Sequence, residues 1–371
     1  MKRIVFVATA ITAPYVIKKV KAFRKAGYDT ILYAYNRGKS FERAGNEELG
    51  DVVDLGYLES GGGYVGKLYK HIGTLKRIYK ENESSDCLYI LFSFDLALIN
   101  WIFFKKDYVY HISDLTYAKM KLKGVVNIFR KIDRQLIRKS LLTIVTSRGF
   151  QNFIFPDGKC ADKIIEIPNL LQEDNPYERK EPQFVKSIEN LSIGFVGLNR
   201  YKSPLNIAKV VGKYFPNMIF HFYGNGFDSV MSEIDKMCAE YPNIKSHGRF
   251  NSTVELQKIY DSIDLLICCY DIENTNVKIA EPNKLFEAIY FNKPIVVSTG
   301  TYLATRVKTL GVGYDIDASD EHSIRCFFDK LTLEELNTKI KTMHSIPAED
   351  LIDKGELVVN SIINRDNNAR Y

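Results

Sequence analysis

The residues best suited to chemistry lie in one segment of the second half of the chain, EPNKLFEAI at 281–289. Pro282 fits near the first turn of a helix predicted over 283–291, where backbone N–H groups without a partner in the helix attract an anion. Glu287 follows one turn later, where its carboxylate can accept hydrogen bonds from two sugar hydroxyls. The alternative, a glutamate that only faces solvent, is less favoured because its neighbour Phe286 is apolar.

Three loops that contain glycine or basic residues precede this segment, and each follows a predicted strand. Gly197 ends the strand LSIGFVG and leads into a loop with two cations before a helix, an arrangement by which doubly wound domains meet phosphate. Glycines after the next two strands would let a ligand approach the backbone. Each loop is also compatible with an ordinary turn and solvent-exposed cations. The residues that these patterns select are Gly197, Arg200, Lys202, Tyr223, Gly224, Asn225, Gly226, Arg249 and Phe250.

The elements that must position these residues alternate between strands and helices along the whole chain. In the first half, apolar strand-like runs are separated by helical stretches at 15–26, 64–80, 95–104 and 124–140. Alternation of this length predicts βαβ units around a parallel sheet, with functional residues beyond the carboxyl ends of the strands.

The same pattern starts again at Leu191, after a charged stretch without periodicity that contains two X-Pro pairs. We therefore predict an α/β protein with two Rossmann-like domains that face each other across a cleft. The first domain would span 1–172, a linker 173–190 and the second domain 191–350. A helical tail at 351–371 could cross back to the first domain.

The composition is that of a folded globular protein: the 371 residues are 46% hydrophobic and 26% charged, which excludes disordered and low-complexity classes. The formal net charge of +6 is uneven, because residues 1–172 carry 28 Lys and Arg against 17 Asp and Glu, a net +11 that leaves −5 for the remainder. A basic half beside an acidic half indicates that the first half meets something anionic. The six cysteines show neither C-x-x-C pairs nor metal-ligand spacing and favour a reducing cytosol.

Two apolar segments resemble membrane-directed sequences. The N-terminal run IVFVATAITA resembles a short signal peptide, but a buried first strand explains it better because it is β-branched and a basic helical stretch follows directly. The segment 88–104 is about long enough for a marginal span, but Asp95 at its centre would cost ~2.5–3.5 kcal/mol on insertion. A strand, a turn and a buried helix are predicted instead, and no transmembrane helix is expected.

Two basic segments carry 13 of the 28 Lys and Arg residues of the first half. The helix predicted at 64–80 and the segment 118–139 interleave Lys and Arg with apolar and aromatic side chains. Amphipathic basic helices bind anionic membrane surfaces, where each cation contributes about 1 kcal/mol. Ordinary helix packing with solvated lysines is the alternative, and nucleic acid is not expected because no recognition module accompanies the charge. The cations are Lys67, Lys70, Lys76, Arg77, Lys80, Lys119, Lys121, Lys123, Arg130, Lys131, Arg134, Arg138 and Lys139, with His71 among them.

Several segments together resemble GT-B glycosyltransferases of the family 4 and family 1 group of bacterial polysaccharide biosynthesis. The run PNKLFEAIYFNKPIVVS at 282–298 is similar to the nucleotide-sugar segment of that group. The runs at 193–211 and 220–226 are similar to the start of its donor domain. The runs IRKSLLTIVTSRGFQNFI at 137–154 and IIEIPN at 164–169 resemble the end of its acceptor domain. The resemblance follows the family's order over nearly the whole chain.

The resemblance implies roles for residues at matching positions. Glu287 would bind the ribose hydroxyls of a nucleotide-sugar donor, and the backbone around 282–284, with Arg200 and Lys202, would hold the diphosphate. No cofactor and no metal are expected, because helix N-termini and cations would take the place of a metal. The segment adds Glu281, Pro282, Asn283 and Lys284 to the donor-binding set.

The same resemblance places the other parts of the substrates. The loop at 249–250 would pack against the base of the nucleotide, and the loop at 223–226 would border that base. The loop Tyr270–Asn276 would contact the donor sugar. Thr9 and Thr12, after the first strand, are expected on the acceptor side.

A catalytic base that deprotonates the acceptor hydroxyl is expected at the strand ends of the first half. Many retaining members of the superfamily carry two glutamates separated by seven residues, but Ile279 stands where the first would lie and Glu281 is too close, which leaves the stereochemistry open. An inverting transfer needs a base that takes the proton of the acceptor hydroxyl. Asp114 and His111, at the end of the fifth strand, are candidates for this base, and Asp95, after the fourth strand, competes with them. The alternative role of Asp114 is the N-cap of a following helix.

These observations predict a metal-independent hexosyltransferase, cytosolic and peripheral at the inner face of the cell membrane. It would move a sugar from a UDP- or GDP-linked donor to a glycan or lipid-linked oligosaccharide of a bacterial surface polysaccharide such as capsule or lipopolysaccharide. One alternative is a UDP-sugar 2-epimerase of the same fold, which would release UDP and an altered sugar without an acceptor. The other is a non-catalytic GT-B subunit that binds another transferase.

Overall fold

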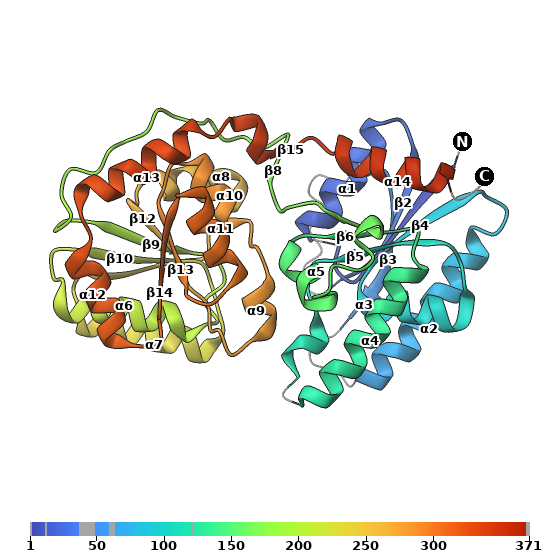
Figure 1. Cartoon of the computed structure of the whole chain (residues 1–371), viewed down its shortest axis with the longest axis horizontal. Helices are drawn as coiled ribbons and strands as arrows, with labels where there is room; N and C mark the ends of the chain where they lie inside the picture. Colours follow the sequence, from blue (N-terminus) through green and yellow to red (C-terminus); the bar gives the residue numbers. More distant parts are fainter. Residues whose placement is uncertain (1, 12, 37–48, 59–63, 121, 369–371) are drawn as a thin grey trace. The chain divides into compact units, whose positions relative to one another are not determined.

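The computed structural model describes residues 2–11, 13–36, 49–58, 64–120 and 122–368 (Figure 1). They divide into two compact units: unit 1 comprises Met1–Asn169 with Lys354–Tyr371, and unit 2 comprises Leu170–Asp353. The main sheet of each unit is parallel throughout, with helices connecting its strands. The predicted α/β class with two Rossmann-like domains is therefore confirmed.

Unit 1 is built on a seven-stranded sheet with the order β3-β2-β1-β4-β5-β6-β7. The N-terminal apolar run forms β1, in which Ile4, Phe6 and Val7 are completely buried, as expected for a strand covered on both faces. The strands are β1 (Arg3–Ala8), β2 (Asp29–Asn36), β3 (Asp51–Tyr57), β4 (Cys87–Phe92), β5 (Tyr108–Ile112), β6 (Leu142–Val145) and β7 (Ile164–Glu166).

The helices of unit 1 connect these strands, and the last one returns from the C-terminal end of the chain. The apolar segment 88–104 forms β4, the short helix α3 and the π-helical turn η2. Among the described residues, no helix combines the length and apolar content needed to cross a membrane. The helices are α1 (Pro14–Lys25), α2 (Tyr64–Glu81), α3 (Phe94–Ile99), η2 (Asn100–Phe104), η3 (Thr116–Lys119), α4 (Lys123–Lys139), α5 (Arg148–Ile154), η4 (Ala161–Lys163) and α14 (Glu356–Asn368).

Helix α14 completes the core of unit 1. Val358, Val359 and Ile362 are buried in the same cluster as the apolar residues of α1, and the two helices lie side by side in Figure 1. The Nζ of Lys2 donates to Asp366 at 2.5 Å. The C-terminal residues thus form part of unit 1, although they follow unit 2 in the sequence.

Unit 2 repeats the architecture with a six-stranded sheet in the order β11-β10-β9-β12-β13-β14. Its strands are β9 (Ser192–Val196), β10 (Ile219–Tyr223), β11 (Ile244–Gly248), β12 (Leu265–Cys268), β13 (Ile295–Ser298) and β14 (Gly313–Ile316). Its helices are α6 (Lys202–Tyr214), α7 (Asp228–Glu240), α8 (Ser252–Asp261), α9 (Thr275–Ile279), α10 (Lys284–Tyr290), α11 (Tyr302–Leu310), α12 (Glu321–Lys330), α13 (Leu333–Ser345) and η5 (Ala348–Leu351).

The chain passes between the units twice, and both passages adjoin one small sheet. Strands β8 (Leu171–Gln172) and β15 (Ile352–Asp353) pair with each other in parallel. The segment 173–190, expected as a linker, packs on unit 2: Tyr177 Oη donates to the carbonyl of Ser252 at 2.8 Å. Ordered contacts of this kind hold the segment against the core of unit 2.

Both large sheets have the strand order of doubly wound folds. In unit 1 the order reverses beside β1, and in unit 2 it reverses beside β9. The helices that leave the two strands at a reversal run to opposite faces of the sheet, which opens a crevice at the carboxyl ends of these strands. The site in unit 2 is therefore expected beyond β9 and β12.

Candidate functional site

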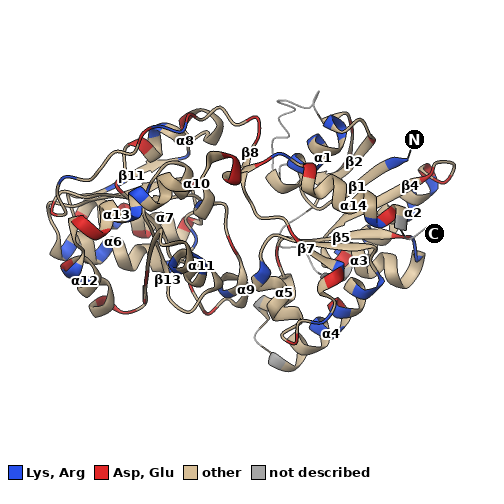
Figure 2. Cartoon of the chain, turned by 45° about the horizontal axis from the view of Figure 1, so that its top comes forward, with Lys and Arg blue, Asp and Glu red and all other residues tan. Residues whose placement is uncertain are grey.

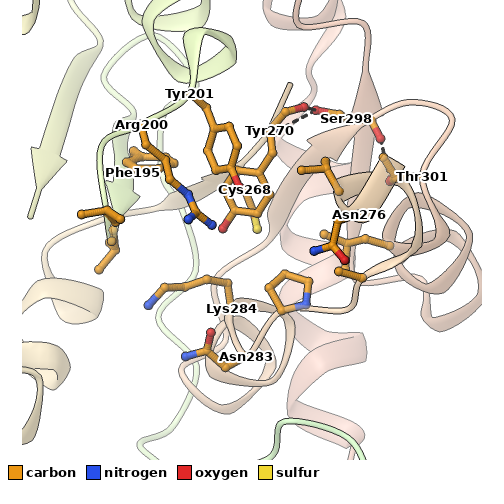
Figure 3. A pocket seen from close by; sticks show the side chains of 17 residues that line it. Phe195, Arg200, Tyr201, Cys268, Tyr270, Asn276, Asn283, Lys284, Ser298 and Thr301 are labelled. Carbon is orange, nitrogen blue, oxygen red and sulfur yellow. Dashed lines mark hydrogen bonds between the residues drawn. The ribbon is translucent and has the colours of Figure 1, made fainter. Parts of the chain in front are cut away.

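One pocket of unit 2 lies at the reversal of its sheet, where β9 and β12 end (Figure 3). Its volume is about 330 Å³. The wall combines the loop after β9 with residues that extend from β12 to the start of α10 and with the region around β13 and α11. It is lined by Phe195, Val196, Gly197, Leu198, Arg200, Tyr201, Cys268, Tyr270, Asn276, Val277, Ala280, Pro282, Asn283, Lys284, Ser298, Thr301 and Leu303.

The charged side chains of this wall are both cationic. In the view of Figure 3, Arg200 and Lys284 lie toward one end of the pocket, and Asn276 and Thr301 lie toward the other. The Arg200 guanidinium lies 4.8 Å from the ring centre of Tyr201, a cation–π contact. Of the residues that the structure describes, no Asp or Glu lines the pocket. The local charge therefore favours an anionic ligand.

Glu287 lies behind the wall. Its carboxylate accepts hydrogen bonds from the side-chain amide of Asn283, from Lys284 Nζ at 2.6 Å and from Tyr260 Oη at 2.8 Å. The Glu287 side chain is 9% exposed, so this glutamate does not face solvent. Burial and the neighbouring carboxylate raise the pKa of Tyr260 well above its usual value, which keeps the phenol protonated as a donor.

The residues just before α10 have two different surroundings. Pro282 and Asn283 line the pocket and precede the helix, which begins at Lys284. Glu281 instead accepts a hydrogen bond from Arg306 Nε of α11 at 2.8 Å, and its side chain is completely buried. The ion pair fixes the start of the segment to α11, and Glu281 is not a residue of the pocket wall.

The glycines of the predicted phosphate loops serve different purposes. A Cβ at Gly197 would meet only the Lys284 side chain, at 3.8 Å, so this glycine borders the pocket. A Cβ at Gly224 would lie 1.9 Å from the carbonyl oxygen of Gly197, and one at Gly226 would lie 2.0 Å from that of Asn199. Gly224 and Gly226 therefore allow two loops of unit 2 to pack backbone against backbone.

Asp271, which lies in the loop expected to contact the donor sugar, instead caps helix α6. Its carboxylate accepts hydrogen bonds from the backbone N–H of Lys202 at 3.0 Å, from that of Ser203 at 2.8 Å and from Ser203 Oγ at 2.8 Å. The amides that would attract a phosphate at this helix end are thus bonded within the protein. The side chain of Lys202 is exposed and lies outside the pocket wall. The available signal was an Asp directly after the apolar strand LLICCY.

Tyr270 is held in the wall by a residue that the sequence analysis missed. Ser298 Oγ accepts from the backbone N–H of Tyr270 at 2.9 Å and donates to its carbonyl at 2.7 Å. The Tyr270 ring packs against Tyr201 with centres 4.7 Å apart. Thr301 in turn donates to the Ser298 carbonyl at 2.9 Å. The hydroxyl groups of Ser298 and Thr301 both donate to carbonyl groups of the protein. These hydrogen bonds hold this part of the pocket wall in place.

The residues predicted around the nucleotide base lie at the end of β10 and in the loops after β10 and β11. The Tyr223 ring stacks on His247 with centres 4.3 Å apart. Phe250 is half-buried against the core of unit 2, whereas Arg249 and Asn225 are exposed. Within the described structure, none of these predicted residues lines the pocket.

In unit 1, the candidates for the acceptor side follow three neighbouring strands. Thr9 comes after β1, Asp95 lies in the first turn of α3 after β4, and Asp114 comes after β5. Asp114 is exposed, and the helix that follows it has Leu115 at the N-cap, so the alternative of an N-cap role for Asp114 is wrong. Thr12 lies outside the described residues.

His111, the other candidate, is buried near the end of β5. His111 is 2% exposed, and its imidazole packs against the rings of Tyr15, at 5.3 Å, and Phe92, at 4.7 Å. Burial, with a contribution from Lys19, lowers the pKa of His111 well below its usual value and keeps the ring neutral. An acceptor can reach Asp114 at the surface but not this imidazole as it is packed here.

Comparison with known proteins supports the fold. No family model and no curated protein sequence matches the chain. Among solved structures, sucrose-phosphate synthase of Thermosynechococcus elongatus is similar at TM-score 0.72 and 12% identity, covering 100% of both chains. HepE of Anabaena in complex with UDP-glucose is similar at TM-score 0.71 and 13% identity, covering 98% of this chain and 100% of that one. WaaG, a glycosyltransferase involved in lipopolysaccharide biosynthesis, is similar at TM-score 0.64 and 13% identity, covering 97% of this chain and 99% of WaaG.

These likenesses cover 97–100% of the chain and agree with two parallel sheets that share the same order over six strands, β7 being the additional strand of unit 1. At 12–13% identity they show the fold alone. The chain has the two-domain GT-B fold of glycosyltransferases.

Proposed function

We propose that the chain is a glycosyltransferase that moves a sugar from a UDP- or GDP-linked donor to a glycan or lipid-linked oligosaccharide in bacterial surface polysaccharide synthesis. The observation that supports this most is the pocket at the sheet reversal of unit 2, with two cations in its wall and a buried carboxylate behind them. HepE binds UDP-glucose and WaaG acts in lipopolysaccharide biosynthesis, which agrees with such a donor and pathway.

In this proposal, the donor's diphosphate lies beside Arg200 and Lys284, and its ribose hydroxyls donate to Glu287. Lys202 has a smaller part than the sequence suggested, because its side chain is outside the pocket wall. Tyr270 and Asn276 lie at the wall where the sugar would follow the diphosphate. The two cations would neutralise the charge of the leaving nucleotide, so no metal ion is required.

Asp114 is proposed as the base that takes the proton of the acceptor hydroxyl during the transfer. It is preferred to His111 because it is exposed, and to Asp95 because the latter is half-buried in the first turn of α3. Asp114→Asn should lower kcat by at least about 100-fold, the usual contribution of general base catalysis, and leave donor affinity unchanged. Near wild-type turnover of this variant would identify another residue as the base.

Donor binding is tested by thermal shift with UDP, GDP and a panel of their sugars. A true donor stabilises the fold by mass action and raises Tm as its concentration increases. Glu287→Ala should weaken the nucleotide about tenfold or more, because hydrogen bonds to a charged group are lost. Glu233→Ala, on the exposed face of α7, is the matched control and should bind as the wild type does. Unchanged affinity of Glu287→Ala would contradict the ribose assignment.

The two alternative functions give different outcomes in the same assay series. A 2-epimerase would convert a UDP-sugar and release UDP with no acceptor present. A non-catalytic subunit would bind no nucleotide, and Glu287→Ala would leave its pathway intact. Transfer of labelled sugar to an acceptor, lost in Asp114→Asn, is the result expected for the proposed transferase.

We also propose that unit 1 attaches to an anionic membrane surface. Basic and apolar side chains alternate along the exposed parts of α2 and α4, η2 adds exposed apolar side chains, and Figure 2 shows Lys and Arg along α4. Leu122 and Phe103 are 71% and 58% exposed, and such side chains enter the headgroup region while nearby cations meet lipid phosphates. His71 is buried and hydrogen-bonds Tyr35, so it has no part in this surface, and Lys121 lies outside the described residues.

Vesicle binding tests the membrane proposal. Reversal of Lys131, Arg138 and Lys139 on α4 to Glu should weaken binding to vesicles with anionic lipid by about 100-fold or more, at ~1 kcal/mol per cation. The control reverses three exposed lysines of unit 2, Lys209, Lys236 and Lys258, and gives the same net charge. Equal losses in both variants would show an effect of net charge alone and contradict a surface on α4.

A further inference from the structure

Lys284 is both a wall residue of the pocket and the partner of the carboxylate behind the wall. Its Nζ lies 2.6 Å from Glu287, and the two side chains are 14% and 9% exposed. Lys284 lines the pocket, whereas Glu287 is not among the lining residues that the structure describes. The ammonium group therefore separates the carboxylate from the pocket space.

Glu287 has little acceptor capacity left while this ion pair is closed. A carboxylate offers about four acceptor positions, and Asn283, Tyr260 and Lys284 take three of them. Tyr260 and Lys284 both donate to the same oxygen, Oε2. The two hydroxyls of a ribose need two acceptor positions, so one protein donor has to leave first.

Of the two donors to Oε2, Lys284 is the one that can move. Tyr260 is completely buried and packs against Phe291 with ring centres 4.6 Å apart, which fixes its hydroxyl. A lysine ammonium, by contrast, is a compact charge on a flexible four-carbon stem. Its stem faces Gly197, at which an added Cβ would meet only Lys284 Cε, at 3.8 Å. The space beside the stem is thus open, and Arg200 lines the same pocket.

We propose that Lys284 is a positioning residue with two positions. In the empty pocket it covers Glu287, and when a nucleotide binds it moves to the diphosphate and uncovers Glu287 for the ribose hydroxyls. This inference rests on the function proposed above, because it takes a nucleoside diphosphate as the ligand. Its consequence is that ribose recognition depends on phosphate: a nucleoside alone has nothing to draw the lysine from the carboxylate.

Calorimetry with UDP, GDP, uridine and guanosine tests this on the full chain. Lys284→Met keeps the aliphatic stem and removes the charge. Nucleotide affinity should fall about tenfold or more, because a charge-assisted phosphate contact is lost. Affinity for the matching nucleoside should instead rise by about threefold or more, because a competing donor no longer covers Glu287.

Two further variants complete the experiment. Lys284→Arg keeps a cation and should restore strong nucleotide binding and weak nucleoside binding. Lys308→Met removes an exposed lysine that pairs with Asp315 at 2.8 Å outside the pocket wall, and should change neither affinity.

The outcomes separate this inference from the proposed function. If the wild-type chain binds UDP or GDP, but Lys284→Met weakens nucleotide and nucleoside by the same factor, Lys284 only supports the pocket and the inference fails. If Lys284→Met does not fold, an increase of nucleoside affinity in Lys284→Arg to the nucleotide level would equally overturn it. If the wild-type chain binds neither nucleotide, the proposed function and the inference both fail.

Discussion

Two buried acidic side chains have different neighbours. Glu287 accepts hydrogen bonds from three donors, one of which is the Lys284 ammonium. Asp133 of α4 is also completely buried, and Tyr117 Oη donates to it at 2.7 Å. Burial raises the pKa of Asp133 to about 7, although hydrogen bonds from Tyr117 and Tyr110 oppose the shift. Ionised Asp133 therefore destabilises unit 1.

This carboxyl makes the stability of unit 1 depend on pH. Unfolded Asp ionises near pH 4, whereas folded Asp133 ionises near pH 7, so the folded state binds more protons between these values. The free energy of unfolding should consequently fall as pH rises from about 4 to about 7 and then level off. Asp133→Asn should remove this fall, so its Tm relative to the wild type should increase by several degrees between pH 5 and pH 8. Asp107→Asn, at an exposed site of unit 1, is the control. A constant Tm difference would contradict the role of Asp133.

At the scale of elements, α6 shows how a distant loop completes a helix that its own sequence leaves uncapped. Tyr201 occupies the N-cap position without a side-chain hydrogen bond, and Asp271 supplies the missing acceptor from the loop after β12. The bond joins the two loops that carry Arg200 and Tyr270, which lie in the same pocket wall. The cap therefore fixes the geometry of the pocket as well as the helix end.

Asp271→Ala should destabilise unit 2 by about 1–2 kcal/mol, the usual loss when an N-cap acceptor is removed. Nucleotide affinity should fall with it, because Arg200 and Tyr270 would no longer be held together. Asp235→Ala, on an exposed part of α7, is the matched control. Differential scanning calorimetry measures the first effect and isothermal titration the second. Wild-type stability in Asp271→Ala would show that solvent caps α6 equally well.

At the scale of the whole molecule, the chain is two units of which one is discontinuous in sequence. Unit 1 consists of Met1–Asn169 and the C-terminal residues Lys354–Tyr371, and α14 buries Val358, Val359 and Ile362 against its core. Unit 2 lies entirely between the two passages of the chain. Loss of the C-terminal residues should therefore affect the first unit and spare the second.

Deletion of 354–371 tests this division. Each buried aliphatic side chain contributes about 1.5–3 kcal/mol, so the melting temperature of unit 1 should fall on the order of 10 °C. The transition of unit 2 should remain, and a bound nucleotide should still raise it. Calorimetric scans with and without UDP or GDP resolve the two transitions. A nucleotide effect abolished by the deletion would contradict the assignment of α14 to unit 1 alone.

The sequence predicts many of the helices and strands, but it predicts fewer of the contacts between residues that are distant along the chain. The apolar runs that became β1, β4 and β9 and the helix at 64–80 were all predicted, because burial imposes its periodicity on neighbouring residues. After residue 299 the periodicity is weaker, and α11, β14 and α12 are not predicted from the sequence. Among the candidate site residues, Glu287, Lys284 and Arg200 can be selected from the sequence by their charge and by their positions relative to predicted strands and helices.

By itself, the sequence determined the α/β class and the repeat of strand and helix in two parts, and it predicts an anion-binding site at the segment EPNKLFEAI, 281–289. Only the tertiary structure decided that Asp271 caps α6, that Gly224 packs on the backbone of Gly197, and that Lys284 covers Glu287. Periodicity is a property of neighbours along the chain and can be read from them. A hydrogen bond between residues about 70 positions apart depends on how strands are ordered and loops packed, which no local pattern records.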